Sequence, residues 1–258
     1  MHVMTEGQGP VVVLSHALAL DSDMWADVAA RLSRKYTVVR YDHRGHGSSP
    51  DARASLPFSM DDLADDAAEV IRQQSSSQAV FVGLSLGGMV AQALAARWPS
   101  LLSGVAILNA TAHYPDRTIW DTRIRAVQAA GMPSIADASI ERWLTPAFRH
   151  SPAGATAEDA LRGRLLNMDP GAYVQTCRAI AAMDMRASNR TLSLPALVVA
   201  GRHDTATPPS MSHALAGDIA GAQVVEVDGA HLSAVECPEQ VADVLEAWLA
   251  RSAGLPPV

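Results

Sequence analysis

Residues 79–87 read Ala79-Val80-Phe81-Val82-Gly83-Leu84-Ser85-Leu86-Gly87, an apolar, β-prone run that leads into a turn of the G-x-S-x-G pattern. A segment of helix-forming composition, residues 88–97, follows the turn at once. Strand, sharp turn and helix in this order are typical of a nucleophile elbow, which holds a serine hydroxyl above the edge of a sheet. The pattern alone also occurs in ordinary glycine-rich loops, so its flanking elements are what favour the elbow.

The elbow predicts a role for each of its residues. Gly83 and Gly87 lack a Cβ atom, which lets the strand and the helix approach closely. Ser85 is the predicted nucleophile. The amide of Leu86 stands at the start of the helix, where free N–H donors and the helix dipole favour negative charge. We therefore expect this amide to form half of an oxyanion hole.

Composition argues against several other classes of protein. The chain has 258 residues, 48% of them hydrophobic, which is enough for one large core. Its formal net charge of −7 is the opposite of the basic surface that binds nucleic acid. No apolar run reaches the length of a membrane span, and residues 1–6 lack the parts of a signal peptide. We expect a cytoplasmic protein in which Cys177 and Cys237 are reduced, with one disulfide as the alternative.

Strands and helices alternate along much of the chain. Apolar, β-branched runs that are typical of buried parallel strands occur at residues 11–14, 36–41, 79–82, 104–108, 196–200 and 223–227. Helices are expected at residues 23–33 and 59–72, and a closing helix at residues 238–251. This alternation predicts an α/β fold with a mainly parallel sheet.

The alternation stops between residues 114 and 188. This part has no convincing strand, and helices are expected near residues 119–130, 134–144, 157–166 and 171–183. We interpret residues 114–188 as a helical cap, inserted into a core domain formed by residues 1–113 and 189–258. Arginine is frequent in the cap, and a solvated helix surface is the expected location for most of these side chains.

Three polar residues follow predicted strands in the order serine, aspartate, histidine. Ser85, Asp204 and His231 each come after a strand, and the carboxyl ends of parallel strands gather at the sheet edge where ligands bind. This chain order is that of hydrolases with a nucleophile elbow. His231 would take the proton of Ser85, and Asp204 would orient the imidazole. Asp184 and Asp228 also lie between Ser85 and His231 in the chain, so they remain alternatives for the acid.

A second oxyanion donor is expected in the loop after the first long strand, Ser15-His16-Ala17-Leu18-Ala19-Leu20. Leu18, two residues after His16, is the preferred candidate. It would act through its backbone N–H, so its side chain is free to pack.

The polar loop at residues 42–48 permits two other interpretations. Gly45-His46-Gly47 resembles the start of a dinucleotide fingerprint, but Pro50 stands where the third glycine is needed. Asp42, His43 and His46 are metal-ligating types, but the chain has no matching second cluster, so a structural loop is favoured. We therefore predict neither a metal nor another cofactor.

Together these motifs resemble those of the α/β-hydrolase superfamily, and more narrowly those of the 3-oxoadipate enol-lactonases of bacterial aromatic-acid degradation. The stretches that carry the resemblance are Ser15-His16-Ala17-Leu18, Tyr41-Asp42-His43-Arg44-Gly45-His46-Gly47-Ser48, Gly83-Leu84-Ser85-Leu86-Gly87-Gly88-Met89, residues 201–209 and residues 230–236. The cap stretch Glu141-Arg142-Trp143-Leu144-Thr145-Pro146-Ala147-Phe148 resembles the lactonase cap and is the more specific signal.

Two features depart from the family pattern. Alanine stands at positions 17 and 19, where many relatives have a glycine nearby, so the oxyanion loop is expected to have a different shape. Relatives usually carry a further strand before the position of His2, and its absence here would leave a sheet of about seven strands. The resemblance thus implies the α/β-hydrolase fold with this smaller sheet and an inserted helical cap.

The resemblance implies hydrolysis of a small lactone that bears a carboxylate, 3-oxoadipate enol-lactone, to 3-oxoadipate. Such a carboxylate needs a cationic partner in a largely apolar pocket, and Arg142 with Trp143 are the candidates. The sequence is equally consistent with Arg142 on the solvent-exposed surface of its helix and with Trp143 packing that helix against its neighbours. A carboxylesterase, a carbon–carbon bond hydrolase and a non-catalytic ligand sensor on this scaffold remain alternatives. Neither nucleic acid nor membrane is an expected partner, and a homo-oligomer is left open.

Overall fold

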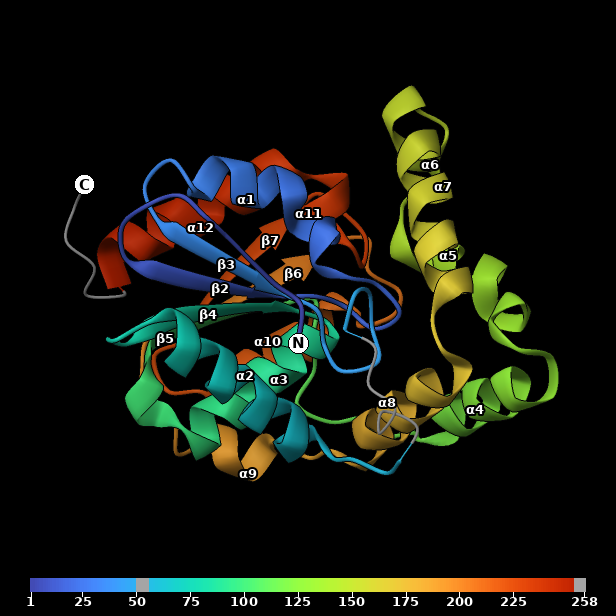
Figure 1. Ribbon diagram of the computed structural model, residues 1–258, viewed down its shortest axis with the longest axis horizontal. Coiled ribbons are helices and arrows are strands. Elements are labelled where there is room, and N and C mark those ends of the chain that lie inside the picture. Colours follow the sequence, from blue (N-terminus) through green and yellow to red (C-terminus); the bar gives the residue numbers. More distant parts are fainter. Residues whose placement is uncertain (50–55, 253–258) are drawn as a thin grey trace.

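The computed structural model describes residues 1–49 and 56–252, and a seven-stranded sheet lies at its centre (Figure 1). The strands are β1 (Val3–Glu6), β2 (Val11–Ser15), β3 (Thr37–Tyr41), β4 (Ala79–Leu84), β5 (Leu102–Leu108), β6 (Ala196–Gly201) and β7 (Gln223–Val227). Their order across the sheet is β1-β3-β2-β4-β5-β6-β7. β1 pairs antiparallel with β3, whereas the other neighbours pair parallel. The predicted α/β fold with a mainly parallel sheet is therefore confirmed.

β1 is a strand that the sequence pattern does not predict. It has four residues, is only partly buried, and lies at the edge of the sheet beside β3. A short edge strand needs no continuous apolar run, because one side of it faces solvent. The amide of Asp42 donates to the carbonyl of His2 at 3.0 Å, so the same segment also holds the start of the loop after β3.

Helices cover both faces of the sheet (Figure 1). On one face lie α1 (Ala26–Leu32), α11 (Ser233–Glu236) and α12 (Pro238–Ser252), and on the other lie α2 (Met60–Gln74), α3 (Leu86–Arg97) and α10 (Pro209–Asp218). The helix expected at residues 23–33 is divided into a 3-10 turn, η1 (Ser22–Trp25), and α1. α2 begins as predicted, because the Ser59 hydroxyl caps the Asp62 amide while the Asp62 carboxylate accepts the Ser59 amide.

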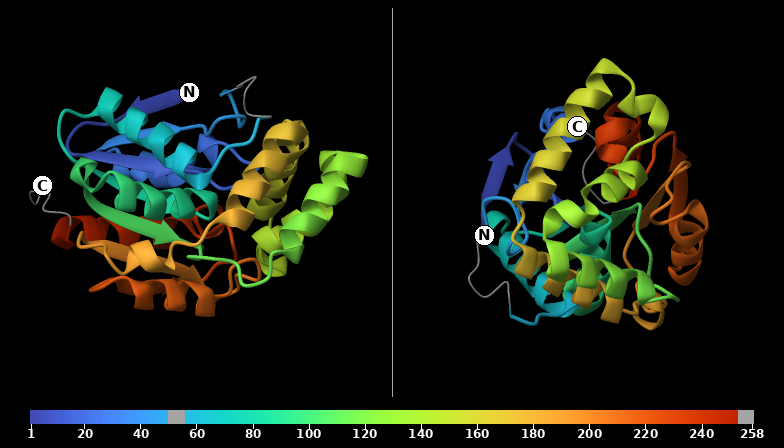
Figure 2. Two further views of the ribbon diagram at one scale, coloured as in Figure 1. Left: turned by 90° about the horizontal axis from the view of Figure 1, so that it is seen from below. Right: turned by 90° about the vertical axis from the view of Figure 1, so that its right-hand side faces the viewer.

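Most of the segment between β5 and β6 consists of helices that stand beside the carboxyl ends of the strands (Figure 2). They are α4 (Thr118–Ala130), η3 (Met132–Ile135), α5 (Ala136–Trp143), α6 (Pro146–Arg149), α7 (Pro152–Asn167) and α8 (Pro170–Ala182). The last helix, α9 (Arg186–Asn189), lies instead against α3 and α10 (Figure 1). The helix expected at residues 134–144 begins at Ala136 as α5, because Pro133 lies in the 3-10 turn η3.

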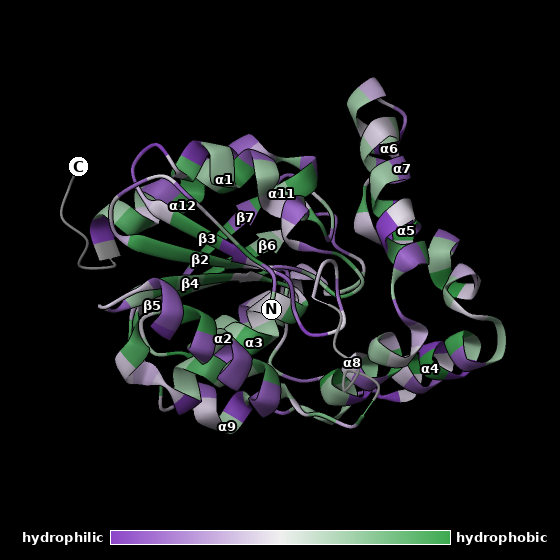
Figure 3. Ribbon diagram, viewed as in Figure 1, coloured by the Kyte–Doolittle hydropathy of each residue, from purple (hydrophilic) through white to green (hydrophobic). Residues whose placement is uncertain are grey.

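Hydrophobic side chains from the sheet and from the inserted helices pack in one continuous core. The strands in the middle of the sheet are the most apolar elements, and the inserted helices alternate between polar and apolar residues (Figure 3). Trp120 of α4 and Ile140 of α5 belong to the same buried cluster as Phe81 of β4. The division into a core at 1–113 and 189–258 and a cap at 114–188 stays a prediction, since packing alone does not define independent units.

Cys177 and Cys237 are both free, so they form no disulfide with each other. Among the helices of residues 1–49 and 56–252, none is long and apolar enough to cross a membrane.

Candidate active site

Ser85 stands between β4 and α3 in a backbone conformation that few residues adopt. Its φ and ψ are 56° and −111°, and its amide donates to the carbonyl of Leu108 at 2.9 Å. A Cβ atom on Gly83 would lie 2.0 Å from the Gly87 carbonyl oxygen, and one on Gly87 would lie 2.2 Å from that of Ser15. Both contacts are too short for any real Cβ atom, so the turn needs glycine at each position.

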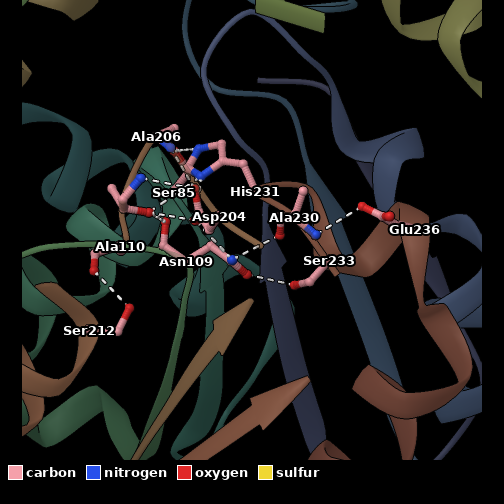
Figure 4. Close-up of polar contacts among 11 residues, drawn as sticks. Ser85, Asn109, Ala110, Asp204, Ala206, Ser212, Ala230, His231, Ser233 and Glu236 are labelled. Atoms are coloured by element: carbon pink, nitrogen blue, oxygen red, sulfur yellow. Dashed lines mark hydrogen bonds and ion pairs between the residues drawn. The ribbon is translucent and has the colours of Figure 1, made fainter. Parts of the chain in front are cut away.

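Ser85, His231 and Asp204 come from three separate loops and form one hydrogen-bonded chain (Figure 4). The Ser85 Oγ lies 2.9 Å from His231 Nε2, and His231 Nδ1 lies 2.8 Å from Asp204 Oδ2. A carboxylate can only accept, so Nδ1 carries the proton of the neutral ring and Nε2 is free to accept the serine hydroxyl. His231 is 5% exposed and Ser85 8%, which leaves both within reach of a small molecule.

Both oxygens of the Asp204 carboxylate accept hydrogen bonds. Oδ1 accepts the amides of Ala206 at 2.8 Å and Thr207 at 2.9 Å, while Oδ2 accepts the Thr207 hydroxyl at 2.8 Å and Asn109 Nδ2 at 3.0 Å. Burial opposes ionisation, but the charge of His231 and these hydrogen bonds outweigh it and lower the pKa of Asp204. This residue is therefore held as an anion against the imidazole.

The two alternative acids lie elsewhere. Asp184 forms an exposed ion pair with Arg186 at 2.6 Å, and Asp228 pairs with His203 at 3.0 Å. Neither of them is among the hydrogen-bond partners found for His231 in the described structure. Geometry thus favours Asp204 over both.

Asn109 is a buried residue of the site that the sequence analysis does not single out. It follows β5 directly, with a φ of 48°, and no part of it is exposed. Its Nδ2 donates to Asp204 and, at 3.2 Å, to the carbonyl of Ala230, while its Oδ1 accepts the Ser233 hydroxyl at 2.6 Å (Figure 4). Asn109 therefore links the acid to both sides of His231. A polar residue directly after a buried strand was the available signal.

Leu18 and Leu86, whose amides are the predicted oxyanion donors, both lie near Ser85. Leu86 is the first residue of α3, so its N–H has no carbonyl partner within the helix. Leu18 lines the cavity that contains Ser85 and His231. The amide of Gly87 donates to the carbonyl of His16 at 3.1 Å, which fixes the loop after β2 against the elbow. In this loop Ala19 adopts a φ of 67°, a conformation that suits glycine better.

The rings of three buried histidines, His16, His43 and His46, pack together, and His16 belongs to the same loop as Leu18. The rings of His43 and His46 lie 4.4 and 5.2 Å from that of His16, centroid to centroid. His16 Nε2 accepts the amide of His43 at 2.9 Å, and Nδ1 donates to the carbonyl of Ala17 at 2.8 Å. Burial lowers the pKa of all three, that of His46 to about 3. In the described residues, no group of three or more His, Cys, Asp or Glu side chains is arranged to hold a metal ion.

A cavity extends from Ser85 and His231 to the inserted helices. Its lining is mainly apolar and aromatic and comprises Ala17, Leu18, Ala19, Ser85, Tyr114, Ile119, Trp120, Arg123, Ser139, Arg142, Trp143, Leu165, Tyr173, Ile180, Thr205, Ala206 and His231. The predicted cap residues Arg142 and Trp143 thus face the same space as Ser85. A second arginine, Arg123, which the sequence analysis leaves among the solvated ones, faces it too.

The end of α5 is hydrogen-bonded to the loop that carries His231. The amide of Leu232 donates to the carbonyl of Trp143 at 3.0 Å. The Glu236 carboxylate accepts the amide of Ala230 at 2.9 Å, and both the amide and the hydroxyl of Thr145. These hydrogen bonds connect the end of α5 with Ala230 and Leu232, the residues on either side of His231.

The fold and this site define the class of the protein. Residues 10–238 match the family described as the alpha/beta hydrolase fold, and the chain belongs to that family.

Among individual relatives, 3-oxoadipate enol-lactonase 2 of Acinetobacter baylyi is 30% identical over 97% of this chain and 93% of its own length. The crystal structure of the enol-lactonase from Burkholderia xenovorans LB400 has a TM-score of 0.92 and 32% identity, and covers 97% of this chain and 96% of its own. A pimeloyl-[acyl-carrier protein] methyl ester esterase of Chromobacterium violaceum is 30% identical over 88% of both chains. These relatives are all hydrolases, but their substrates differ.

Proposed function

We propose that this protein is a serine hydrolase that opens a small carboxylate-bearing enol-lactone, 3-oxoadipate enol-lactone, to 3-oxoadipate. The observation that carries the proposal is the hydrogen-bonded chain Ser85–His231–Asp204, which opens into a cavity that Arg142 also lines. Similarity to two enol-lactonases over nearly the full chain supports the substrate.

Ser85 would begin the reaction by attacking the lactone carbonyl. His231 Nε2, 2.9 Å from the Ser85 Oγ, can take the proton as the new C–O bond forms. Asp204 then stabilises the imidazolium through the Nδ1 hydrogen bond. The negative oxygen of the tetrahedral intermediate would accept hydrogen bonds from the amides of Leu18 and Leu86.

Collapse of this intermediate breaks the bond between the acyl carbon and the enol oxygen. The proton on His231 passes to that oxygen. The enol stays attached to the acyl group, because both were parts of the lactone ring. A water molecule, deprotonated by His231, then attacks the acyl-enzyme. The bond between the acyl carbon and the Ser85 Oγ then breaks, and His231 returns the proton to that oxygen. The product leaves with a new carboxylate, and its enol tautomerises to the ketone.

The lining of the cavity supports a small substrate with one charged group. Apolar and aromatic side chains form most of the wall, and such a wall binds hydrocarbon while a few polar groups fix orientation. Arg142 would bind the free carboxylate and Trp143 would pack against the ring.

The test is to follow loss of the enol-lactone absorbance with the purified protein, Ser85→Ala and Ser103→Ala. Ser103, on β5, is a matched control away from the cavity. We expect rapid turnover by the wild type and by Ser103→Ala, and a loss of about 10⁴-fold or more in Ser85→Ala, as for other serine nucleophiles.

A carboxylesterase is the second candidate, favoured by the similarity to a methyl ester esterase. The same proteins are therefore assayed with p-nitrophenyl acetate. Hydrolysis of this ester by a wild-type protein that leaves the lactone intact would overturn the lactonase proposal. Loss of that hydrolysis in Ser85→Ala would still support the nucleophile.

A further inference from the structure

Two arginines face the cavity without a carboxylate partner. Arg123 of α4 and Arg142 of α5 both line it, together with Ser85. Across residues 1–49 and 56–252, no acidic side chain forms an ion pair with either of them. Four other arginines of the inserted helices are paired: Arg149 with Glu158, Arg162 with Asp137 and Glu158, Arg164 with Asp21 and Asp23, and Arg186 with Asp184. Arg125 and Arg178 hydrogen-bond only to neutral side chains among the described residues, but neither of them lines this cavity.

Aromatic side chains hold Arg123 at this position. Its guanidinium carbon lies 5.1 Å from the centroid of the Trp120 ring, within the range of a cation–π contact. The Trp120 ring in turn packs edge-on against Tyr114, with centroids 5.1 Å apart. Burial raises the pKa of Tyr114 and Tyr173, and the nearby charge of Arg123 opposes that rise. Trp120, Tyr114 and Tyr173 all line the cavity, so the guanidinium lies at its wall.

Arg142 is half-buried, and one of its nitrogens lacks a partner. Its Nε is buried and has no hydrogen-bond acceptor in the described structure. Burial, and then the positive charge of Arg123, lower the pKa of Arg142 to about 10. Two guanidinium groups in an apolar cavity repel each other, and an unpaired buried charge is unfavourable. A bound anion would remove the repulsion and give the buried Nε–H an acceptor.

We propose that Arg123 and Arg142 together bind the carboxylate of the substrate, and that Arg123 makes the enzyme select anionic over neutral lactones and esters. The inference rests on the proposed hydrolase function and adds a specificity residue to it. A carboxylate has two oxygens and accepts from two guanidinium groups at once, which suits a pair drawn from two helices.

The kinetic test compares two lactones that share one ring. In 3-oxoadipate enol-lactone the ring bears a carboxymethyl group, and in α-angelica lactone it bears a methyl group. We expect Arg123→Met to lower kcat/KM for the anionic lactone by about 10- to 100-fold, as for loss of a charged hydrogen bond. The neutral lactone should change by less than about threefold, since no charge is lost from its complex.

Two matched variants control for general damage. Arg125→Met removes an arginine from the same helix at an exposed position outside the cavity, and it should leave both lactones unaffected. Arg123→Lys keeps the charge without the planar fork, so part of the discrimination should return. Equal losses on both lactones in Arg123→Met would overturn the inference.

Binding of glutarate, measured by calorimetry, tests the arginine pair without any turnover. We expect Arg123→Met and Arg142→Met each to weaken binding at least about tenfold, and Arg125→Met to leave it unchanged. Unchanged binding in Arg123→Met would contradict the inference whatever the kinetics. If the wild type leaves both lactones intact while glutarate binding still needs both arginines, the lactonase proposal is wrong and the carboxylate site stands.

Discussion

Ala19, Ser85 and Asn109 have φ values of 67°, 56° and 48°, and all three lie beside the groups that would react. An L-residue in this region carries a cost of about 1–2 kcal/mol, which the surrounding packing must offset. Ser85 carries the nucleophile, Ala19 follows a proposed oxyanion donor, and Asn109 holds the acid. Backbone strain is thus concentrated where geometry matters for chemistry.

The strain at Ala19 can be measured against a neighbouring alanine. Ala17 and Ala19 are equally buried, but only Ala19 has a positive φ. We expect Ala17→Gly to lower the free energy of unfolding by about 0.5–1 kcal/mol, the usual effect of the more flexible glycine. The change in the free energy of unfolding in Ala19→Gly should be about 1–2 kcal/mol more favourable than in Ala17→Gly. The reason is that Ala19→Gly also removes the cost of an alanine with a positive φ. Urea unfolding of the two variants measures the difference, and equal values would show that Ala19 is unstrained.

Asn109 should affect the rate of reaction more than the binding of substrate. Its amide donates to Asp204 and to the Ala230 carbonyl, and it does not line the cavity. We expect Asn109→Ala to lower kcat by about 10- to 100-fold through the lost hydrogen bond to a charged group, with KM nearly unchanged. Ser212→Ala is the control, since Ser212 is as buried and its hydroxyl, among the described residues, bonds the Ala110 carbonyl alone, at 3.4 Å. A large rise in KM with kcat intact would argue against a positioning role.

At the scale of the element, sequence patterns predict those strands and helix ends that the residues of the element itself determine. The apolar runs identify six of the strands, and Ser59 with Asp62 marks the start of α2 through its capping box. β1 is not predictable in this way, because it is a short edge strand without a continuous apolar run. The elbow is predictable since Gly83 is required by the close approach of β4 and α3, and Gly87 by that of α3 and Ser15 at the end of β2.

The cluster of His16, His43 and His46 should make the stability of the fold sensitive to acid. An ordinary histidine has a pKa of 6.5, and burial lowers that of His46 to about 3 in the folded protein. Between these values the unfolded chain binds a proton at this position and the folded chain does not. The contribution of the neutral, buried His46 to the free energy of unfolding is therefore fully present above pH 6.5. It is lost as the pH falls toward 3.

His46→Gln should remove up to about 1.4 kcal/mol per pH unit from the slope of unfolding free energy against pH below pH 6.5. Urea unfolding between neutral and mildly acidic pH measures the slope. His150→Gln, at an exposed position, is the matched control. Equal slopes in the wild type and His46→Gln would mean that His46 titrates alike in the folded and unfolded states.

At the scale of the whole molecule, the site depends on contacts that no local pattern encodes. Ser85, Asp204 and His231 are predictable because each follows a strand of a parallel sheet. Asn109 also follows a strand, but its contact with Asp204, like the place of Arg123 at the cavity, depends on neighbours that lie far away in the chain. Arg123 in particular resembles any arginine on a helix until the fold turns it toward Ser85.

The shared core predicts that the inserted helices and the sheet unfold together. Trp120 and Trp143 report on the inserted helices, and Trp25 and Trp248 report on the packing around the sheet. We expect denaturation curves from tryptophan fluorescence and from far-ultraviolet circular dichroism to coincide, as for a single cooperative unit. The same curves for Trp120→Phe and Trp143→Phe, which remove the reporters in the inserted helices, should also coincide. An earlier fluorescence transition that these substitutions abolish would show instead that the cap is an independent unit.

The hydrogen bonds between residues 143–145 and the loop of residues 230–236 bear on how proteins of this fold can diversify. A chimera whose inserted helices lack Thr145 would lose the hydroxyl that bonds Glu236, and Glu236 also holds the amide of Ala230 beside His231. An exchange of the helices alone would then also disturb the position of His231. Transfer of residues 230–236 along with the helices should preserve turnover, which makes this loop and the cap one heritable module.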